Sequence, residues 1–422
     1  MELDGAQPGA TDSPVVNRDR VLMTTTAYPP STGGVQAHIA DLRQHLQHYQ
    51  ADIVTLWLEN RTDWLLGTTL RLPPPAKDEP GVRRLGWTTP QRRRMLPWVL
   101  GYYGLVPLAA DRLSRIMAPA LDGLVAPEHV LIHNHRIGRE FLALASLQVA
   151  RRRNLPFVLT PHHHPKWHGY RYRGWLKVYR NADAVLTQTA AEQEELVRIG
   201  VDPQRITVIW CAADDPLPGD ASRFLARFAD PSAPLVLFVG QQYQYKGVAE
   251  LLAAVDALHA RGSNANLAFI GPSTPFSTRF FRQNARPWLG VLGPVPAQEK
   301  WDALEAAAVV CLPSRHEAFG RIYLEAWSKG KPVIGGRIPA VRDVIEDGRS
   351  GLLVTPGSAG ELSQALERIL SDPALARQMG ERGAQALHDR FNWPNVVARV
   401  ESAYAKALER VTGRRQLSSP VE

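Results

Sequence analysis

The sequence predicts an α/β protein of two domains, each a parallel sheet covered by helices. Short apolar runs alternate with longer amphipathic stretches along the 422-residue chain. This length suits two domains of ordinary size, and 45% hydrophobic residues are enough for two buried cores. A proline- and glycine-containing break at Asp214 to Gly219 separates the two sets of runs, so we place the hinge near Cys211 to Asp220.

The apolar runs predict the strands in chain order. For the first sheet they are Arg20–Thr26, Asp52–Trp57, His129–Ile132, Pro156–Thr160, Ala184–Thr187 and Ile206–Ile209. For the second they are Leu235–Val239, Leu267–Ile270, Val309–Leu312, Pro332–Ile334 and Leu352–Val354. Helices are expected at Val35–His48, Phe319–Lys329 and Val396–Leu408. We therefore expect a disordered leader over 1–18, a first domain over 19–212 and a second over 213–395.

Composition excludes several classes of protein. With Cys211 and Cys311 as the two cysteines, neither a disulfide framework nor a cysteine-rich zinc site is expected, and a reducing cytoplasm is favoured. The N-terminus has no basic-then-apolar signal pattern. Apolar runs stay short of the roughly 20 residues that a spanning helix needs. We expect a cytoplasmic protein, either soluble or peripheral on the inner face of the membrane.

Two glutamates carry the strongest indication of function. Glu317 and Glu325 are separated by seven residues and lie between an apolar strand and a helix. A strand–loop–helix unit aims its helix start beyond the carboxyl edge of the sheet, where the amides of Phe319, Gly320 and Arg321 could meet phosphate or sugar oxygens. A carboxylate can also accept bonds from two neighbouring hydroxyls, as in a ribose. By themselves the two glutamates are more typical of a solvated helix surface, and the surrounding residues reverse that balance.

The surrounding residues resemble the retaining glycosyltransferases with the Glu-x7-Glu motif, the large family four, which have the GT-B architecture of two facing Rossmann-like domains. Similar segments, in the family's order, run from about residue 20 to 410: Tyr28–Val35, Ala182–Thr189, Val236–Gly240, Lys246-Gly247, Lys329–Ile334 and Glu346–Val354. The resemblance implies an inter-domain cleft and a last helix, about 396–412, that packs back on the first domain. It also implies hexose transfer from a nucleoside diphosphate sugar.

The resemblance assigns donor-binding roles to residues of both halves. Gly33, Gly34 and Gly240 would let the backbone approach the diphosphate, and Lys246 would supply a charge to it. Phe319, Gly320 and Arg321 would add amides, while Glu325 would hold the ribose. Glu317 and His162 are the expected catalytic residues beside the donor sugar. The glycines of the first loop could equally serve only to turn the chain, and a lone lysine is usually a surface residue.

Three departures from the family pattern concern the donor. Gln241 stands where many members have an arginine, so we expect Arg315, Arg321 or Arg337 to compensate. Cys211-Ala212 and Pro339-Ala340 replace the family's Asn-Gly and paired glycines. These changes leave a second reading open, in which the chain is a sugar-nucleotide sensor or scaffold without turnover. An epimerase or phosphorylase of the same architecture is a further enzymatic alternative.

Three consecutive histidines, His162 to His164, follow a predicted strand. A zinc site is not favoured, because adjacent residues of an extended chain point to opposite sides. We expect no metal, with Lys246 and backbone amides stabilising the leaving diphosphate instead. His133 and His135 are weaker candidates for contacts with the acceptor. The base, the sugar and the acceptor stay open in the sequence.

Basic residues gather in two windows. Between Val82 and Ala120 seven arginines, among them Arg83 and Arg115, face one acid, Asp111; between His162 and Arg180 five cations face none. The second window, Lys166–Arg180, interleaves Trp167, Tyr170, Tyr172, Trp175 and Tyr179, and the first has an apolar stripe of Leu96, Val99, Tyr103 and Val106. These windows favour an anionic membrane carrying a lipid-linked acceptor. A solvated face or a soluble anionic acceptor is the alternative, and nucleic acid is disfavoured because no recognition module accompanies them.

Overall fold

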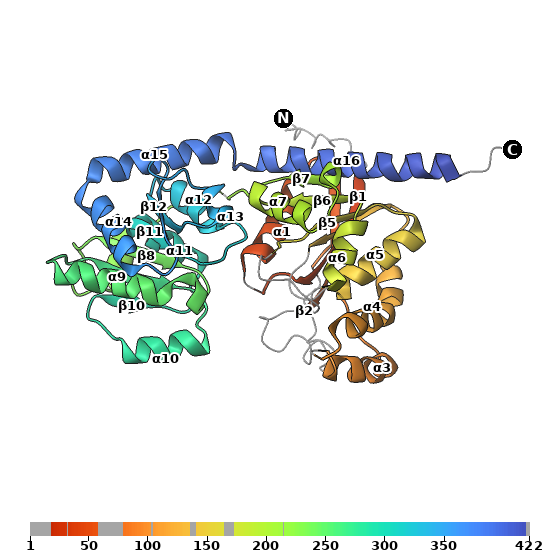
Figure 1. Cartoon of the computed structure of the whole chain (residues 1–422), viewed down its shortest axis with the longest axis horizontal. Coiled ribbons are helices and arrows are strands. Elements are labelled where there is room, and N and C mark those ends of the chain that lie inside the picture. The colour runs from red at the N-terminus through yellow and green to blue at the C-terminus, as the bar shows by residue number, and fades with distance from the viewer. Residues whose placement is uncertain are drawn as a thin grey trace, which may run out of the picture.

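Two parallel sheets in two neighbouring domains make up the protein (Figure 1). The computed structural model describes residues 18–31, 33–57, 79–102, 104–135, 141–163, 173–213 and 215–418. The expected leader up to residue 17, Tyr103 and the segment 164–172 lie outside these residues. The predicted fold class is confirmed, because both sheets are wholly parallel and carry helices.

The first sheet has the strand order β3-β2-β1-β4-β5-β6-β7. Its strands are β1 (Asp19–Ala27), β2 (Tyr49–Trp57), β3 (Val82–Arg84), β4 (His129–His135), β5 (Phe157–Thr160), β6 (Ala184–Thr187) and β7 (Ile206–Val208). Its helices are α1 (Gly34–His45), α3 (Thr89–Leu100), α4 (Val106–Asp122), α5 (Phe141–Arg153), α6 (Arg173–Asn181) and α7 (Ala190–Arg198).

Alternating residues of the strands supply two separate cores. Leu22 and Ile132 belong to the core that α3 to α6 cover, whereas Val21 and Met23 belong to the core under α1 and α16. Successive side chains of a strand point to opposite faces, so a sheet buried on both sides needs unbroken apolar runs. This requirement explains why apolar runs in the sequence predicted most strands of the first sheet.

The second sheet has the order β10-β9-β8-β11-β12-β13. Its strands are β8 (Leu235–Val239), β9 (Asn266–Ile270), β10 (Leu289–Val291), β11 (Ala307–Leu312), β12 (Val333–Gly336) and β13 (Leu352–Val354). Its helices are α8 (Ala221–Leu225), α9 (Val248–Ala260), α10 (Pro275–Gln283), α11 (Ala297–Ala306), α12 (Arg321–Trp327), α13 (Pro339–Arg342), α14 (Ala359–Ser371) and α15 (Pro373–Asp389).

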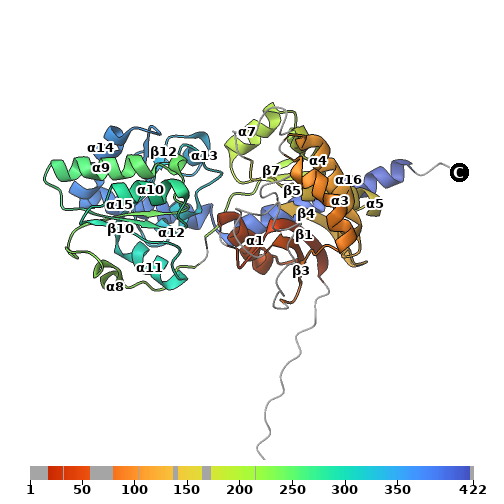
Figure 2. The same ribbon diagram turned by 90° about the horizontal axis from the view of Figure 1, so that it is seen from below.

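The last helix, α16 (Trp393–Ser418), crosses from the second domain and runs along the first (Figures 1 and 2). Val396, Val400 and Tyr404 are buried in the core that it shares with α1 and the first sheet. Glu401 accepts hydrogen bonds from the amides of Gln47 and His48 at 2.8 and 2.9 Å, which joins the helix to the loop before β2.

Two strands were not predicted, and one predicted helix begins at a different residue. The edge strands β3 and β10, Val-Arg-Arg and Leu-Gly-Val, are only partly buried and therefore form no apolar run. Helix α12 begins at Arg321 instead of Phe319, because Gly320 has the left-handed φ of 93° and the Phe319 ring packs on Phe391 at 5.7 Å. None of the described helices combines the length and apolar composition needed to cross a bilayer.

We expect Glu401→Ala to lower the free energy of unfolding by about 1 to 2 kcal/mol, because two backbone N–H groups lose their acceptor. Urea unfolding followed by circular dichroism measures this change. Lys406→Ala, on an exposed part of the same helix, is the matched control and should stay within about 0.5 kcal/mol of the unmutated protein. Equal losses in the two variants would contradict the role given to Glu401.

Candidate functional site

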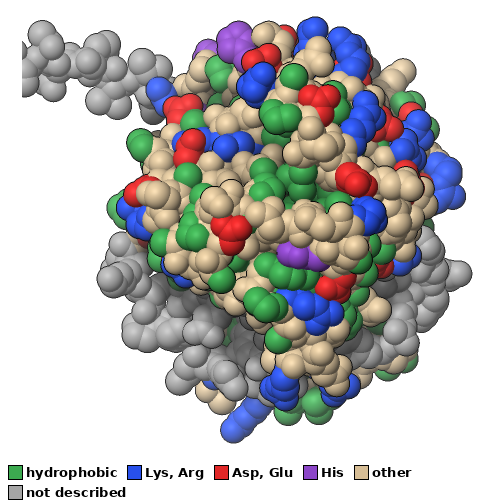
Figure 3. Space-filling view, turned by 90° about the vertical axis from the view of Figure 1, so that its left-hand side faces the viewer, with side chains coloured by type: hydrophobic (Ala, Val, Ile, Leu, Met, Phe, Trp, Pro, Cys, Tyr) green, Lys and Arg blue, Asp and Glu red, His purple; other side chains and the backbone are tan. Residues whose placement is uncertain are grey.

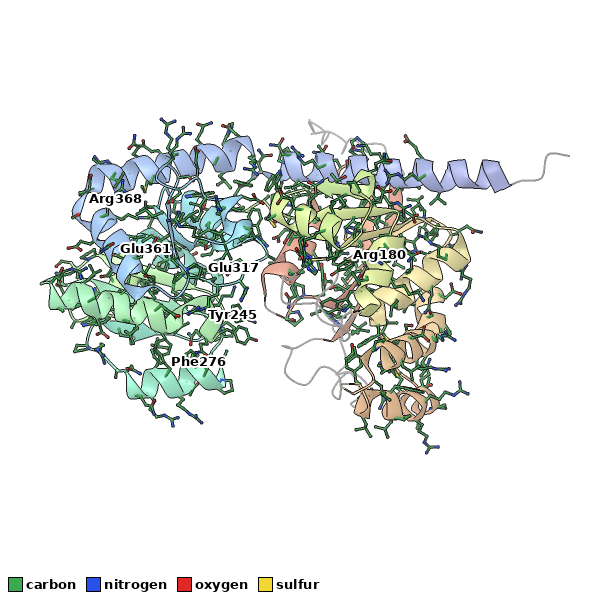
Figure 4. All side chains as sticks on the ribbon, in the orientation of Figure 1. Arg180, Tyr245, Phe276, Glu317, Glu361 and Arg368 are labelled. Carbon is green, nitrogen blue, oxygen red and sulfur yellow. The ribbon has the colours of Figure 1, made fainter. Side chains whose placement is uncertain are left out.

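Two loops meet at the carboxyl edge of the second sheet. One follows β8 and holds Lys246, and the other follows β11 and holds Glu317. The Arg315 amide donates to the Tyr245 carbonyl at 2.8 Å, and Lys246 Nζ forms an ion pair with Glu317 Oε1. The Ser314 hydroxyl donates to the same carboxylate oxygen at 2.9 Å. Two residues that the sequence predicted separately therefore form one charged pair, on the side facing the first domain (Figure 4).

Glycines shape both loops. Gly247 has φ of 80°, and a Cβ there would lie 2.7 Å from the Pro313 carbonyl oxygen in the other loop. Gly320, also left-handed, leaves no room for a Cβ beside the Tyr323 ring. The close approach of the two loops thus depends on the absence of a side chain at Gly247, whereas Gly320 makes room for Tyr323 of α12.

Helix α9 begins at Val248, directly after Lys246 and Gly247, and no side chain caps its start. The first N–H groups of a helix have no partner within it, and the helix dipole adds partial positive charge there. These donors follow Lys246 almost directly in the chain. The local chemistry therefore suits an anion such as a diphosphate.

Glu325 pairs with a residue that sequence reasoning missed. Lys300 Nζ of α11 lies 2.8 Å from Glu325 Oε2, and both side chains are mostly buried. Lys300 precedes Glu325 by 25 positions and belongs to another helix, so no local pattern signals the contact. Glu325 is therefore held in a fixed place, with its second oxygen left as an acceptor.

The three arginines expected to compensate for Gln241 each have a carboxylate partner. Arg315 pairs with Glu250 at 2.9 Å, Arg321 with Asp41 at 2.8 Å and Arg337 with Asp347 at 2.6 Å. A diphosphate would have to compete with those carboxylates for any of these guanidinium groups. Lys246 is paired in the same way, with Glu317, but it differs in lying directly before the uncapped start of α9.

The Arg321–Asp41 pair joins the two domains. Arg321 begins α12 of the second domain, Asp41 lies on α1 of the first, and their side chains are 12% and 17% exposed. A second link runs from the Ala191 amide of α7 to Asp343 Oδ2 at 2.7 Å. Two polar contacts therefore bridge the boundary beside the candidate site.

Gly33 and Gly34 stand where predicted, at the start of α1, which begins at Gly34. Gly240 ends β8, but its amide donates to the Ile270 carbonyl of β9 at 2.8 Å. That amide therefore serves the junction between the strands. Gly33 and Gly34 belong to the first domain and Lys246 to the second, so only the packing of the domains brings them toward a common ligand.

His162 lies in a buried group of imidazoles at the end of the first sheet. Its ring is 6.2 Å from His38 and 6.1 Å from His135, and its Nδ1 lies 3.1 Å from Gln188 Oε1. Gln188 in turn donates to Cys211 Sγ at 2.8 Å. Because the amide oxygen can only accept, His162 carries its proton on Nδ1. His38, on α1, was not singled out in the sequence.

His133 and His135 lie inside the first domain and not on its surface. Both are fully buried, and His133 bonds to the Tyr404 hydroxyl at 2.6 Å and to Thr160 Oγ1 at 2.8 Å. These contacts make His133 a link between α16 and β5, so the expectation of an acceptor contact from it is wrong. In the described part of the chain no three His, Cys, Asp or Glu side chains form a metal-binding group.

Burial lowers the pKa of three of these histidines. It brings that of His133 to about 3, with a smaller effect from His162. The pKa of His135 also lies well below its ordinary value, through burial and then through His133, His162 and His38. For His38 the causes are burial, His162 and then the Arg321 charge, which shows that Arg321 reaches this group.

The basic windows are arranged differently from the expectation. Trp175 and Tyr179 of α6 are buried in the first domain's core, as are Val99 and Val106. Trp175, Tyr179, Val99 and Val106 therefore serve the core, whereas Leu96 of the stripe is half-buried and lies outside it. A surface hollow bordered by Arg342, Arg382 and Arg390 lies on the second domain. Lys246 and Glu317 are not among the residues that border it.

Comparisons with known proteins agree with this architecture. Residues 32–215 match the family described as Glycosyltransferase Family 4, and residues 226–386 match Glycosyl transferases group 1. The structure of Alr3699/HepE from Anabaena in complex with UDP and glucose superposes with a TM-score of 0.69 at 16% identity, covering 92% of this chain and 100% of that one. This likeness identifies the GT-B fold of two Rossmann-like domains.

Curated relatives point the same way. D-inositol 3-phosphate glycosyltransferase of Corynebacterium glutamicum is 33% identical over 245 residues, 54% of this chain and 58% of that protein. Glycogen synthase of Mycobacterium tuberculosis is 25% identical over 415 residues, 92% of this chain and 95% of that protein. The chain spans about three fifths of the first relatives it matches. Its two halves are thus similar to two glycosyltransferase families, and its fold is that of the GT-B proteins.

Acid should destabilise the protein below about pH 6.5. Histidines of the unfolded chain have ordinary pKa values near 6.5, above the lowered pKa values of the folded protein. Between these two values the unfolded chain binds more protons, so the free energy of unfolding decreases as the pH decreases. Each buried histidine should contribute about 1.4 kcal/mol per pH unit there. Denaturant unfolding between pH 5 and 8 measures the slope. His135→Gln should reduce it, and an unchanged slope would contradict this account.

Breaking the inter-domain ion pair should cost stability. We expect Asp41→Asn and Arg321→Gln each to lower the free energy of unfolding by about 1 to 3 kcal/mol, since each leaves a mostly buried charge without its partner. The double variant should lose at least about 1 kcal/mol less than the sum of the two. Thermal and urea unfolding of the four proteins complete this cycle, and strict additivity would exclude a direct interaction.

Proposed function

We propose that the protein transfers a hexose from a nucleoside diphosphate sugar to an acceptor hydroxyl, with retention of anomeric configuration. The observation that carries this proposal is the Lys246–Glu317 ion pair at the carboxyl edge of the second sheet, beside the start of α9. Ligands of open parallel sheets bind at this edge. The similarity of both halves to glycosyltransferase families supports the same reaction class.

Lys246 and Glu317 divide the donor between them in this mechanism. The diphosphate displaces Glu317 as the partner of Lys246 and takes hydrogen bonds from the first amides of α9. The released Glu317 carboxylate then accepts hydrogen bonds from hydroxyls of the donor sugar. Ser314, bonded to the same carboxylate at 2.9 Å, keeps Glu317 oriented during this exchange. The diphosphate must therefore bind Lys246 before the Glu317 carboxylate becomes available to the donor sugar.

The bond changes balance without a protein nucleophile. The bond from the anomeric carbon to the diphosphate oxygen breaks while a bond to the acceptor oxygen forms on the same face. The departing diphosphate accepts the acceptor's proton, and Lys246 with the α9 amides stabilises its negative charge. No metal ion is required, because these groups supply the positive charge.

Other residues orient the two substrates. Glu325, held by Lys300, accepts hydrogen bonds from the ribose through its remaining oxygen. His162, with its proton on Nδ1 held by Gln188, faces the donor sugar from the first domain. Gly33 and Gly34 admit the diphosphate close to the backbone of α1.

The acceptor is a sugar or a lipid-linked sugar in envelope polysaccharide or glycolipid synthesis, met at the cytoplasmic face of the membrane. The basic windows Arg83–Arg115 and Lys166–Arg180 favour an anionic surface over a nucleic acid. A soluble phosphorylated polyol is the alternative, since the Corynebacterium relative is named for D-inositol 3-phosphate.

The test is donor hydrolysis and thermal stabilisation against UDP-, GDP-, ADP- and dTDP-sugars, with a chelator present. One donor should stabilise the protein and be hydrolysed slowly without metal. Glu317→Gln should keep the stabilisation by the nucleoside diphosphate and lose at least roughly a hundredfold in kcat. Lys246→Ala should lose the stabilisation as well, because the diphosphate loses its cation.

Glu346→Gln is the matched control, since it removes a carboxylate from an exposed pair with Arg349 in the same domain. Its turnover should equal that of the unmutated protein. Full turnover by Glu317→Gln would overturn the assignment of that residue. Stabilisation by a sugar nucleotide with no turnover on any acceptor would favour the non-catalytic alternative.

A further inference from the structure

Among the described residues, the turn between α3 and α4 carries three exposed apolar side chains. Leu100, Leu105 and Leu108 are 68%, 50% and 44% exposed, which makes them half of the exposed large hydrophobic residues in the described part of the chain. All three lie within nine positions, at the end of α3 and the start of α4. We call these three residues the leucine tip.

The helices that carry the tip are firmly built. Val99, Tyr102 and Val106 from the same turn are buried in the first domain's core, and Thr88 caps α3 with a reciprocal bond to Gln91. The tip therefore lies between residues that anchor the hairpin in the core. Figure 1 places α3 at the lower edge of the first domain, and Figure 2 shows α3 and α4 on its outer surface.

Arginines follow the leucines along the exposed faces of both helices. On α4 the spacing of three, four and three residues sets Leu105, Leu108, Arg112 and Arg115 on one face. On α3 the exposed Arg93 and Arg94 lie about two turns before Leu100. A rise of ~1.5 Å per residue puts Arg112 and Arg115 about 6 and 10 Å behind Leu108.

Basic residues outnumber acidic ones near the tip. Helix α3 contains no acidic residue, and in α4 the nearest acid, Asp111, pairs with Arg115 at 3.0 Å. Arg93 and Arg94 have no carboxylate partner among the described residues. Arg112 lies over the Trp98 ring at 5.7 Å, which holds its guanidinium beside the hairpin. At the end of the second domain shown in Figure 3, by contrast, acidic and basic side chains are interspersed.

We propose that the leucine tip inserts into an anionic lipid surface while Arg93, Arg94, Arg112 and Arg115 bind the headgroup phosphates. Interfacial segments bury apolar side chains about 5–10 Å deep, which matches the separation between the leucines and the arginines. Arginine also binds phosphate through two parallel bonds. The proposal rests on the proposed function in one respect, that a lipid-linked acceptor would be met at this surface.

Other occupants of the tip fit less well. Single-stranded nucleic acid is bound through stacking on aromatic rings, and the exposed side chains here are leucines. A second copy of the chain would bring like charges together, since the arginines on both copies would face each other. An anionic lipid surface satisfies the leucines and the arginines at once.

Sedimentation with lipid vesicles tests this inference on the full chain. Vesicles of phosphatidylcholine alone are compared with vesicles containing 30% phosphatidylglycerol, at low and at high salt. The unmutated protein should bind the anionic vesicles at least tenfold more tightly than the neutral ones, and high salt should weaken binding. Absence of binding to anionic vesicles at low salt overturns the proposal.

Leu100→Ser/Leu105→Ser/Leu108→Ser should reduce binding to the anionic vesicles at least tenfold. The matched control is Val197→Ser/Leu217→Ser/Val291→Ser, which changes the other three exposed apolar residues. It should bind within about twofold of the unmutated protein. Equal vesicle binding by the tip variant and the control overturns the proposed insertion. The proposal is also overturned if the unmutated protein self-associates, and the tip variant loses this self-association but binds vesicles as before.

Insertion depth has its own readout. Leu108→Cys labelled with a polarity-sensitive fluorophore should shift to shorter wavelength on anionic vesicles, whereas Val197→Cys should not. The native Cys211 and Cys311 are buried and should resist labelling. Donor hydrolysis without vesicles is measured in parallel: hydrolysis with no vesicle binding rejects only the tip, and binding with no hydrolysis rejects only the proposed transferase.

Discussion

The return of α16 to the first domain is the constraint on which the rest of the structure depends. Its apolar face completes the core under β1 and β4, and Tyr404 bonds to His133 deep inside that core. The chain therefore crosses between the domains twice, once near Trp210 and once near Arg390. Arg390 lies over the Trp210 ring at 3.5 Å, so the two crossings also contact each other. This double connection limits how far the domains can separate.

The candidate site uses that connection. Lys246 and Glu317 come from loops of the second domain, whereas Gly33, Asp41 and His162 belong to the first. Arg321 contributes to both, since its backbone starts α12 and its side chain pairs with Asp41. A donor molecule held by the second domain would therefore meet the first domain without a large rearrangement. The charge of Arg321 also explains part of the lowered pKa of His38.

Sequence reasoning succeeded where burial on both faces imposes an unbroken apolar run. Strands β6, β8 and β13 begin and end at the predicted residues. It failed for β3 and β10, because Val-Arg-Arg and Leu-Gly-Val are only partly buried and form no apolar run, unlike the equally short but buried β13. Val99 and Trp175 were read as surface residues, because an amphipathic helix with basic neighbours has the same periodicity whether its apolar face meets lipid or a sheet. The three exposed leucines were hidden by the same ambiguity.

By itself the sequence determined the parallel α/β class and the positions of most strands along the chain. It also showed that Lys246, Glu317 and Glu325 follow strands of the second sheet. Those features depend on local periodicity and on residues close together in the chain. Only the tertiary structure decided that Lys246 pairs with Glu317, Lys300 with Glu325 and Arg321 with Asp41. Such partners lie 25 to 280 positions apart, and no local propensity encodes which distant side chains the packing of helices and sheets brings together.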